Sequence, residues 1–205
     1  ERKKITKVYN QNQNDKNKEI NLSILLRIIN RLRSKLISLE PNNESFWSEY
    51  TLSRDHYSNT DIEIKKNFFK KFIFEKSGNL LDIGCNTGEF LELASQNKNI
   101  QPYGIDFDEE CINFTQKKYI NRNINLSCIN IANPPNGIGW LNSETKAFIK
   151  KNEAFYDILL FFGIMHHLMV THRIPLNEIF GLLKNLTKNY IVYEFVNNED
   201  KKFLE

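Results

Sequence analysis

The sequence predicts an α/β fold with a parallel sheet, and three observations lead to this class. From residue 79 onward, short apolar runs alternate with longer segments whose apolar residues recur at helical spacing. Such alternation is typical of βαβ units, whose strands lie parallel. The first apolar run, at residues 80–83, ends at a turn bracketed by Gly84 and Gly88. The second run, at residues 101–106, ends in Asp106.

The glycine-bracketed turn lies between a buried strand and the start of a helix. Behind it, Phe90, Leu91, Leu93 and Ala94 recur at helical spacing. A turn in this position aims backbone N–H groups and the positive end of a helix at a ligand. Gly84 and Gly88 permit positive φ and a close approach of the backbone. We therefore expect a ligand beside this turn.

The residues around the turn favour a ligand without phosphate groups. The dinucleotide fingerprint needs a glycine five residues after the first, and position 89 is Glu. A pyrophosphate at this helix end would meet the Glu89 carboxylate. Asp82, within the preceding strand, suits an ammonium or sulfonium ligand. Asp106 follows Gly84 at about the distance where nucleotide-binding α/β folds hydrogen-bond a ribose.

These segments resemble the motifs of class I S-adenosylmethionine-dependent methyltransferases. Residues 80–88 (Leu-Leu-Asp-Ile-Gly-Cys-Asn-Thr-Gly) are similar to the first motif, and Gly-Ile-Asp at 104–106 is similar to the second. Residues 156–168 resemble the fourth strand and the turn after it. Further similarities, to a bacterial subgroup known from nodulation loci, are Trp47, Tyr50, His56, Tyr57, Gly139, Trp140 and Glu194 to Val196. The resemblance covers residues 45–200 and implies a Rossmann-like sheet, with S-adenosylmethionine as cofactor.

The resemblance implies a cofactor site built from several loops. The expected contacts are Asp82, Gly84, Cys85, Asn86, Gly88, Asp106, Phe107, Asn130, Ile131, Phe161, Phe162 and Tyr57. Asp82 would hold the ammonium region of the cofactor, and Asp106 the ribose hydroxyls. Asn130 ends the third predicted strand (124–130), where the family usually has an acid that pairs with the adenine amino group. An asparagine can still accept through its amide oxygen.

Histidines are the candidates for catalysis. A sulfonium is already a strong electrophile, so the protein mainly positions the acceptor and excludes water. If the acceptor is a hydroxyl or a protonated amine, a base helps, and His166 or His56 is the candidate. Adjacent residues on a helix face different ways, so at most one of His166 and His167 should point into the site. The spacing of histidines and cysteines does not favour a metal site.

The first 43 residues predict a basic polar linker followed by an amphipathic helix. Residues 1–40 carry ten Lys and Arg against four Asp and Glu, within a chain of net charge +3. Steps of three and four residues relate Leu22, Leu25, Ile29, Leu32, Leu36 and Leu39. This stripe is too short for a free-standing coiled coil, so we expect it to pack elsewhere in the protein or on a protein partner. The basic charge suits RNA, an acidic partner or a membrane surface, but we favour a solvated arm.

Residues 44–205 predict one methyltransferase-like domain, with a helical lid at 44–78 and a Rossmann-like core at 79–205. The final two strands of the family's sheet do not appear before residue 205, and the chain lacks an initiator Met, so we expect an excerpt of a longer protein. No apolar run approaches the roughly 20 residues that cross a bilayer. Three scattered cysteines argue against a disulfide framework, and we expect a cytoplasmic protein.

We interpret the chain as an S-adenosylmethionine-dependent methyltransferase whose acceptor is unidentified: a small molecule, RNA or protein. The alternative is a catalytically silent methyltransferase-like module that senses the cofactor or acts as a scaffold in a larger assembly. The incomplete glycine pattern and Glu89 disfavour an NAD-dependent oxidoreductase. Trp140, in an insertion at 136–155 with a helical run to Ala154, is interpreted as a packing anchor rather than as a cover over the substrate.

Overall fold

The computed structural model describes residues 22–39 and 59–195, and the chain divides into two compact units, residues 1–43 and 44–205. In the first unit, helix α2 spans Leu22–Ser38. The predicted site residues His56 and Tyr57, and the aromatic group at Trp47 and Tyr50, lie outside the described residues.

The second unit alternates helices and strands along the chain. Its elements are α4 (Asn59–Phe74), β1 (Gly78–Ile83), α5 (Glu89–Ala94), β2 (Ile100–Asp106), α6 (Glu109–Lys118), β3 (Asn125–Cys128), the 3-10 turn η1 (Trp140–Asn142), α7 (Phe148–Lys151), β4 (Tyr156–Phe161), the π-helical turn η2 (His167–Thr171), α8 (Leu176–Leu186) and β5 (Thr187–Tyr193).

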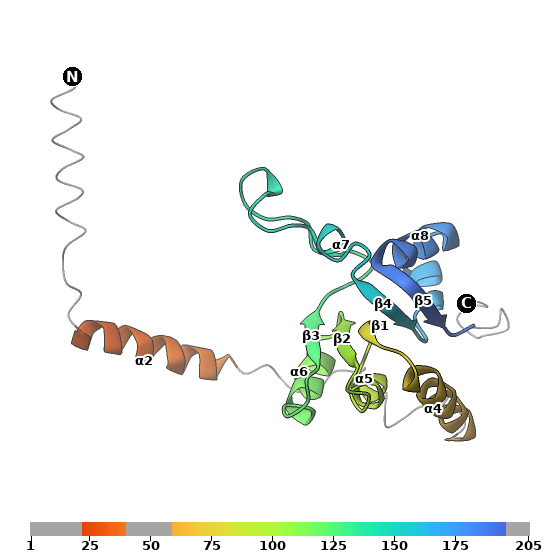
Figure 1. The fold of residues 1–205 in the computed structure, drawn as a ribbon. Helices are drawn as coiled ribbons and strands as arrows, with labels where there is room; N and C mark the ends of the chain where they lie inside the picture. Colours follow the sequence, from red (N-terminus) through yellow and green to blue (C-terminus); the bar gives the residue numbers. More distant parts are fainter. Residues whose placement is uncertain (1–21, 40–58, 196–205) are drawn as a thin grey trace. The chain divides into compact units, whose positions relative to one another are not determined.

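The five strands form one parallel sheet in the order β3-β2-β1-β4-β5 (Figure 1). The chain runs outward from β1 through β2 to β3 and then returns to place β4 on the other side of β1. The strand order therefore reverses between β1 and β4. In open parallel sheets, ligands bind at the carboxyl ends of the strands beside such a reversal. The predicted parallel α/β sheet is confirmed.

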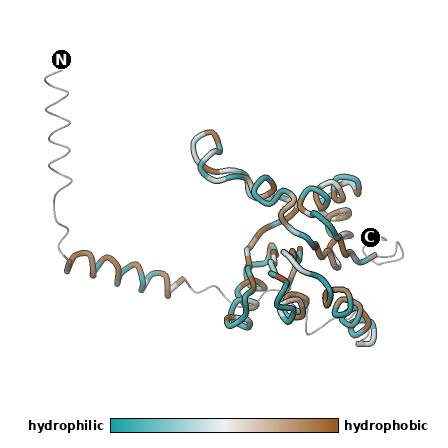
Figure 2. Tube along the Cα trace, in the orientation of Figure 1, coloured by the Kyte–Doolittle hydropathy of each residue, from teal (hydrophilic) through white to brown (hydrophobic). Residues whose placement is uncertain are grey.

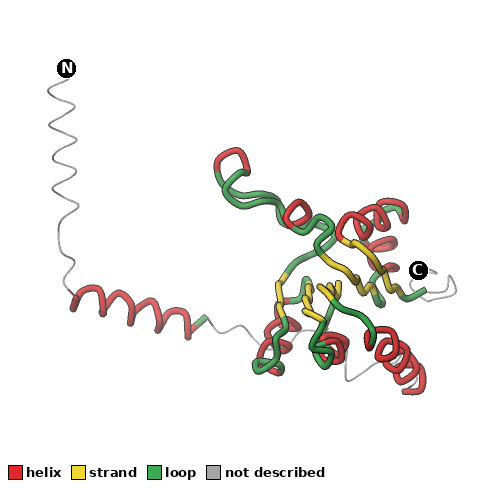
Figure 3. The backbone as a smooth tube through the Cα atoms, in the orientation of Figure 1, coloured by secondary structure: helices red, strands yellow, loops and turns green. Residues whose placement is uncertain are grey.

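Helices cover both faces of the sheet, as the nearly continuous apolar runs of its central strands require. Helices α4, α5 and α6 lie on one face, and α7 and α8 lie on the other (Figure 3). Successive residues of a strand pack against opposite helix layers. Leu80 packs with Phe69 of α4 and Leu91 of α5, whereas Leu81 packs with Leu183 of α8. The strands lie at the apolar centre between these layers (Figure 2). Burial on both faces holds the carboxyl ends of β1 and β4 in place.

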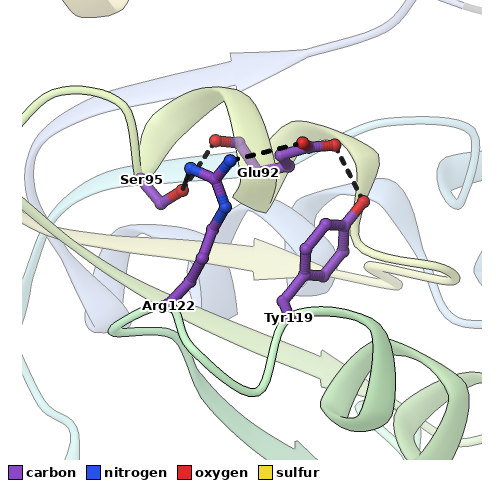
Figure 4. A network of polar contacts seen from close by, with 4 residues as sticks. All are labelled: Glu92, Ser95, Tyr119 and Arg122. Carbon is purple, nitrogen blue, oxygen red and sulfur yellow. Dashed lines mark hydrogen bonds and ion pairs between the residues drawn. The ribbon is translucent and has the colours of Figure 1, made fainter.

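A polar network fastens α5 to the end of α6 behind the glycine turn (Figure 4). The Tyr119 hydroxyl donates to Glu92 Oε2 at 2.9 Å, and Arg122 Nη2 lies 3.6 Å from Glu92 Oε1. Arg122 Nη1 also donates to Ser95 Oγ at 3.2 Å. Partial burial is the main cause that raises the pKa of Tyr119, so its hydroxyl remains a donor.

Two local predictions differ from the structure. The apolar run at 190–196 predicts the fifth strand, but β5 begins at Thr187 because no loop separates it from α8. The Thr187 hydroxyl donates to Leu183 O at 2.7 Å and closes the helix end. Trp140 is 79% exposed, so its interpretation as a packing anchor is wrong. It belongs to a short 3-10 turn in a loop that extends away from the sheet (Figure 1), rather than to a helix packed on the core.

Candidate functional site

A cavity of about 580 Å³ opens at the carboxyl ends of the strands. Its walls come from the glycine turn after β1, the loops after β2 and β3, the segment after β4, and helix α4. The cavity therefore lies at the reversal of strand order, where parallel α/β sheets bind ligands. Its volume falls in the range typical of small-molecule and cofactor sites, about 300–1,000 Å³.

The glycine turn adopts the conformation that its sequence predicts. Gly84, Asn86 and Gly88 have φ values of 70°, 47° and 74°. The N–H groups of Gly84 and Cys85 both donate to Ile105 O, at 2.7 and 3.1 Å, which ties the turn to β2. A side chain at Gly84 would collide with Ile164 on the segment after β4. The left-handed backbone angle at Gly84 therefore favours glycine, and the Ile164 side chain would have to shift to admit any other residue.

Asp106 fixes the turn from the end of β2. Its Oδ2 accepts the Asn86 N–H at 2.8 Å, and its Oδ1 accepts the Asp108 N–H at 3.0 Å. The side chain is 7% exposed and lines the cavity. Burial raises the pKa of Asp106, while the N–H groups of Asp108 and Asn86 oppose that rise. The Phe107 N–H acts on the carboxylate in the same sense, and a carboxylate with about four acceptor positions keeps capacity for a further donor, such as a ligand hydroxyl.

Asp82 is a second buried carboxyl on the same wall. It is 3% exposed, and burial, followed by the nearby Asp106 charge, raises its pKa to about 8; Lys65 acts in the opposite direction. Below that pH the isolated protein keeps Asp82 protonated. A cation placed in the cavity against Asp82 would favour the ionised form. Two carboxyl groups can accept hydrogen bonds from hydroxyl groups and balance a positive charge. Asp82 and Asp106 therefore fit a ligand that carries both hydroxyl groups and a cation.

Lys65 of α4 and Glu194, just after β5, meet at the cavity. The Lys65 ammonium donates to Glu194 Oε2 at 2.7 Å and lies 4.5 Å from the centroid of the Phe162 ring and 5.5 Å from that of Phe90. Both charged residues line the cavity, and neither was predicted as a site residue from the sequence. Lys65 belongs to a polar run of α4 that resembles any solvated helix face, so its sequence gives no signal. Glu194 directly follows β5, and a polar residue at the carboxyl end of a parallel strand could have been predicted as a site residue.

Both adjacent histidines line the cavity, together with His172. The rings of His166 and His167 lie 4.2 Å apart between centroids. The expectation that at most one of the two side chains points into the site stays a prediction. Directly after His166, η2 is π-helical and is closed by a hydrogen bond from His172 N to His167 O at 3.2 Å.

Most of the predicted site residues that the structure describes line this cavity. They are Asp82, Gly84, Cys85, Asn86, Asp106, Phe107, Asn130, Ile131, Phe162 and His166. The amide oxygen of Asn130 accepts the Ala132 N–H at 2.9 Å.

Gly88 and Phe161 do not line the cavity. Gly88 backs onto α6, where an added Cβ would lie 2.5 Å from Thr115 Cγ2. Phe161 is fully buried in the core on the α8 face. Within residues 22–39 and 59–195, no three His, Cys, Asp or Glu side chains are grouped to hold a metal ion, and no helix has the length and apolarity to cross a membrane.

Comparisons with known proteins agree with this geometry. Residues 55–201 match the family described as "Methyltransferase domain". Nodulation protein NoeA of Rhizobium meliloti (strain 1021) is 27% identical over 168 residues, which are 80% of this chain and 34% of NoeA. The solved bifunctional kinase-methyltransferase WbdD has a TM-score of 0.51 at 20% identity, over 82% of this chain and 36% of WbdD, and shows the same fold.

A methyltransferase from Aquifex aeolicus, described as SAM dependent, is also similar, with a TM-score of 0.46 at 18% identity over 62% of this chain and 61% of that one. The chain spans about a third of the length of NoeA and of WbdD. The resemblance drawn from the sequence motifs, including that to nodulation proteins, is confirmed. The chain belongs to the methyltransferase domain family.

Proposed function

We propose that residues 44–205 form a catalytic domain that binds S-adenosylmethionine and transfers its methyl group to an acceptor, which is a small molecule, RNA or protein. One observation supports this most strongly: two buried carboxyls line the cavity from adjacent strands, Asp82 one residue before the end of β1 and Asp106 as the last residue of β2. Such a pair fits a ligand that combines a cation with ribose hydroxyls, as this cofactor does.

The residues present match the parts of the cofactor. Asp106 would accept the ribose hydroxyls, and Asp82 would face the ammonium group. Phe107, Asn130 and Ile131 would line the adenine, with the remaining acceptor capacity of the Asn130 amide available to its amino group. The glycine turn at 84–86 supplies a close backbone wall. We further propose that α4 acts as part of a lid, because Ile62 and Lys65 on it line the cavity.

Lys65 matches the last charged group of the cofactor, its carboxylate. Its ammonium lies at the cavity beside two aromatic rings, and its present partner is the Glu194 carboxylate. A ligand carboxylate would compete with Glu194 for Lys65. Glu194 would then face the part of the cavity that receives the methyl acceptor.

When bound, the cofactor supplies an electrophilic methyl group on a sulfonium. The protein would hold the acceptor in line with that group and exclude water from the site. The rings of Phe90 and Phe162, together with α4, would shield the site from water. For a hydroxyl or protonated amine acceptor, His166 is proposed to take the proton. His56 stays a prediction for the same role.

Calorimetry with S-adenosylmethionine and with its demethylated product tests the cofactor assignment. We expect micromolar binding, and we expect Asp82→Asn and Asp106→Asn each to weaken it. The control is Glu153→Gln, which removes the charge of an exposed residue that does not line the cavity. Transfer of a labelled methyl group to a component of cell extract then tests the activity. Binding without transfer to any acceptor would favour the silent cofactor-sensing module.

A further inference from the structure

Helix α2 has an apolar face that is too wide for a single helical partner. At 3.6 residues per turn, its leucines and isoleucines cover about half of the circumference. None of the residues of α2 is buried, and these apolar side chains are 39–69% exposed. Apolar positions recur along the whole helix in Figure 2. A surface of this extent loses free energy to water unless something covers it.

The polar face of α2 combines neutral residues with positive charges and has no negative charge. Arg27, Arg31 and Lys35 follow one another at four-residue steps, so they form one line along the helix. Arg33 adds a fourth positive charge, and the helix contains no Asp or Glu. The cover over the apolar face must therefore be compatible with a dense positive charge beside it.

A second copy of the helix does not meet this requirement. In a coiled coil built on the Leu25 and Leu32 stripe, Arg33 and Lys35 would flank the seam, and α2 holds no Asp or Glu that could pair with them. The stripe would also leave Ile24 and Ile37 in water, because they lie outside it. RNA would satisfy the charges but would leave the whole apolar face exposed.

We propose that α2 lies in the plane of an anionic membrane surface. A lipid bilayer covers an apolar face of any width, and anionic headgroups complement the basic line beside it. Arg33, which projects from the apolar side, reaches the headgroups by extending its long side chain. The helix is 17 residues long and carries four charges, so it rests on the bilayer rather than crossing it.

Vesicle flotation of the whole 205-residue chain tests the proposal. We expect binding to vesicles of equimolar phosphatidylcholine and phosphatidylglycerol, weakened by salt, and little binding to phosphatidylcholine alone. The double variant Arg27→Glu/Arg31→Glu should lower the affinity for anionic vesicles by more than about tenfold.

A matched pair of variants separates the apolar face from net charge. Ile29→Glu/Leu32→Glu and Asn30→Glu/Ser34→Glu change the charge equally, but only the first pair lies on the apolar face. We expect the first to abolish vesicle binding and the second to retain more of it. An unchanged unfolding midpoint shows that both variants keep the fold. Equal loss of vesicle binding in the two variants would overturn the proposal, and so would no binding of the original protein to anionic vesicles. A stable dimer formed through α2, with the protein remaining unbound to vesicles, would overturn it as well.

Discussion

Lys65 on α4 and Glu194 after β5 join two ends of the domain across the cavity, with 2.7 Å between Nζ and Oε2 and 129 residues between them in the chain. The neighbouring Lys66 makes a similar ion pair, at 2.6 Å, with Glu89 at the start of α5. The side chains of both lysines are about one-fifth exposed, at 23% and 22%. Only Lys65 lines the cavity, so the two residues form a matched pair for mutation.

Lys65→Met should weaken S-adenosylmethionine binding by about tenfold or more, because a charged hydrogen bond in a partly buried site is lost. Binding of decarboxylated S-adenosylmethionine should change little, since that ligand lacks the carboxylate assigned to Lys65. Lys66→Met is the control and should leave both affinities near their original values. Calorimetry measures all six dissociation constants. Equal weakening of both ligands by Lys65→Met would contradict the assignment.

Cofactor binding should release a proton below pH 8. The pKa of Asp82 is about 8 in the protein alone, and a bound cation lowers it, so ionisation accompanies binding. The affinity should therefore rise with pH, by up to about tenfold per unit, and level off above pH 8. Calorimetry in buffers of different ionisation enthalpy measures the proton count. Asp82→Asn should remove both the release and the rise; persistence of either in this variant assigns the proton to another group.

The stability of the free protein should move in the opposite sense with pH. Because the folded pKa of Asp82 lies above its ordinary value of 3.8, the folded state binds more protons than the unfolded state between the two values. The free energy of unfolding should then fall as pH rises from about 4 to 8, by at most roughly 1.4 kcal/mol per unit from this group. Urea unfolding of the original protein and Asp82→Asn at pH 5 and pH 8 measures the difference. Parallel profiles would show that Asp82 titrates normally.

Gly88→Ala should destabilise the domain by about 1–3 kcal/mol. Its φ of 74° is left-handed, and a new Cβ would lie 2.5 Å from Thr115 Cγ2 on α6. Gly181→Ala provides the control: it lies inside α8 with nothing within 4 Å of the added carbon, and should stabilise the helix by about 0.5–1 kcal/mol. Urea unfolding measures both, and a stable Gly88→Ala variant would refute this account of the turn.

Tyr119 and Glu92 should show a coupling of about 0.5–1.5 kcal/mol, because their hydrogen bond joins α6 to α5 in a partly buried place. A double-mutant cycle with Tyr119→Phe and Glu92→Ala measures it through the free energies of unfolding. Additive losses would mean that the bond in Figure 4 contributes nothing to the packing of the two helices.

Local patterns in the sequence predict the framework of this protein well. Apolar runs and helical spacing predict the order of strands and helices, and the run 80–88 predicts the positive φ of Gly84 and Gly88. Parallel strands bring their carboxyl ends to one edge, so residues after three strands, such as Asn86, Asp106 and Asn130, could be expected at one site. These properties depend on neighbours within a few residues or on the simple geometry of a sheet.

The sequence alone therefore determined the parallel α/β architecture, the glycine turn and the two acidic residues of the adjacent strands, Asp82 and Asp106. Only the tertiary structure decided that Lys65 meets Glu194, that Gly88 backs onto α6 rather than the cavity, that Trp140 is exposed to solvent, and that His166 and His167 both line the cavity. The physical reason is distance along the chain. Spacing patterns report which face of its own element a residue occupies, whereas contacts between elements depend on how helices pack across the ends of the sheet.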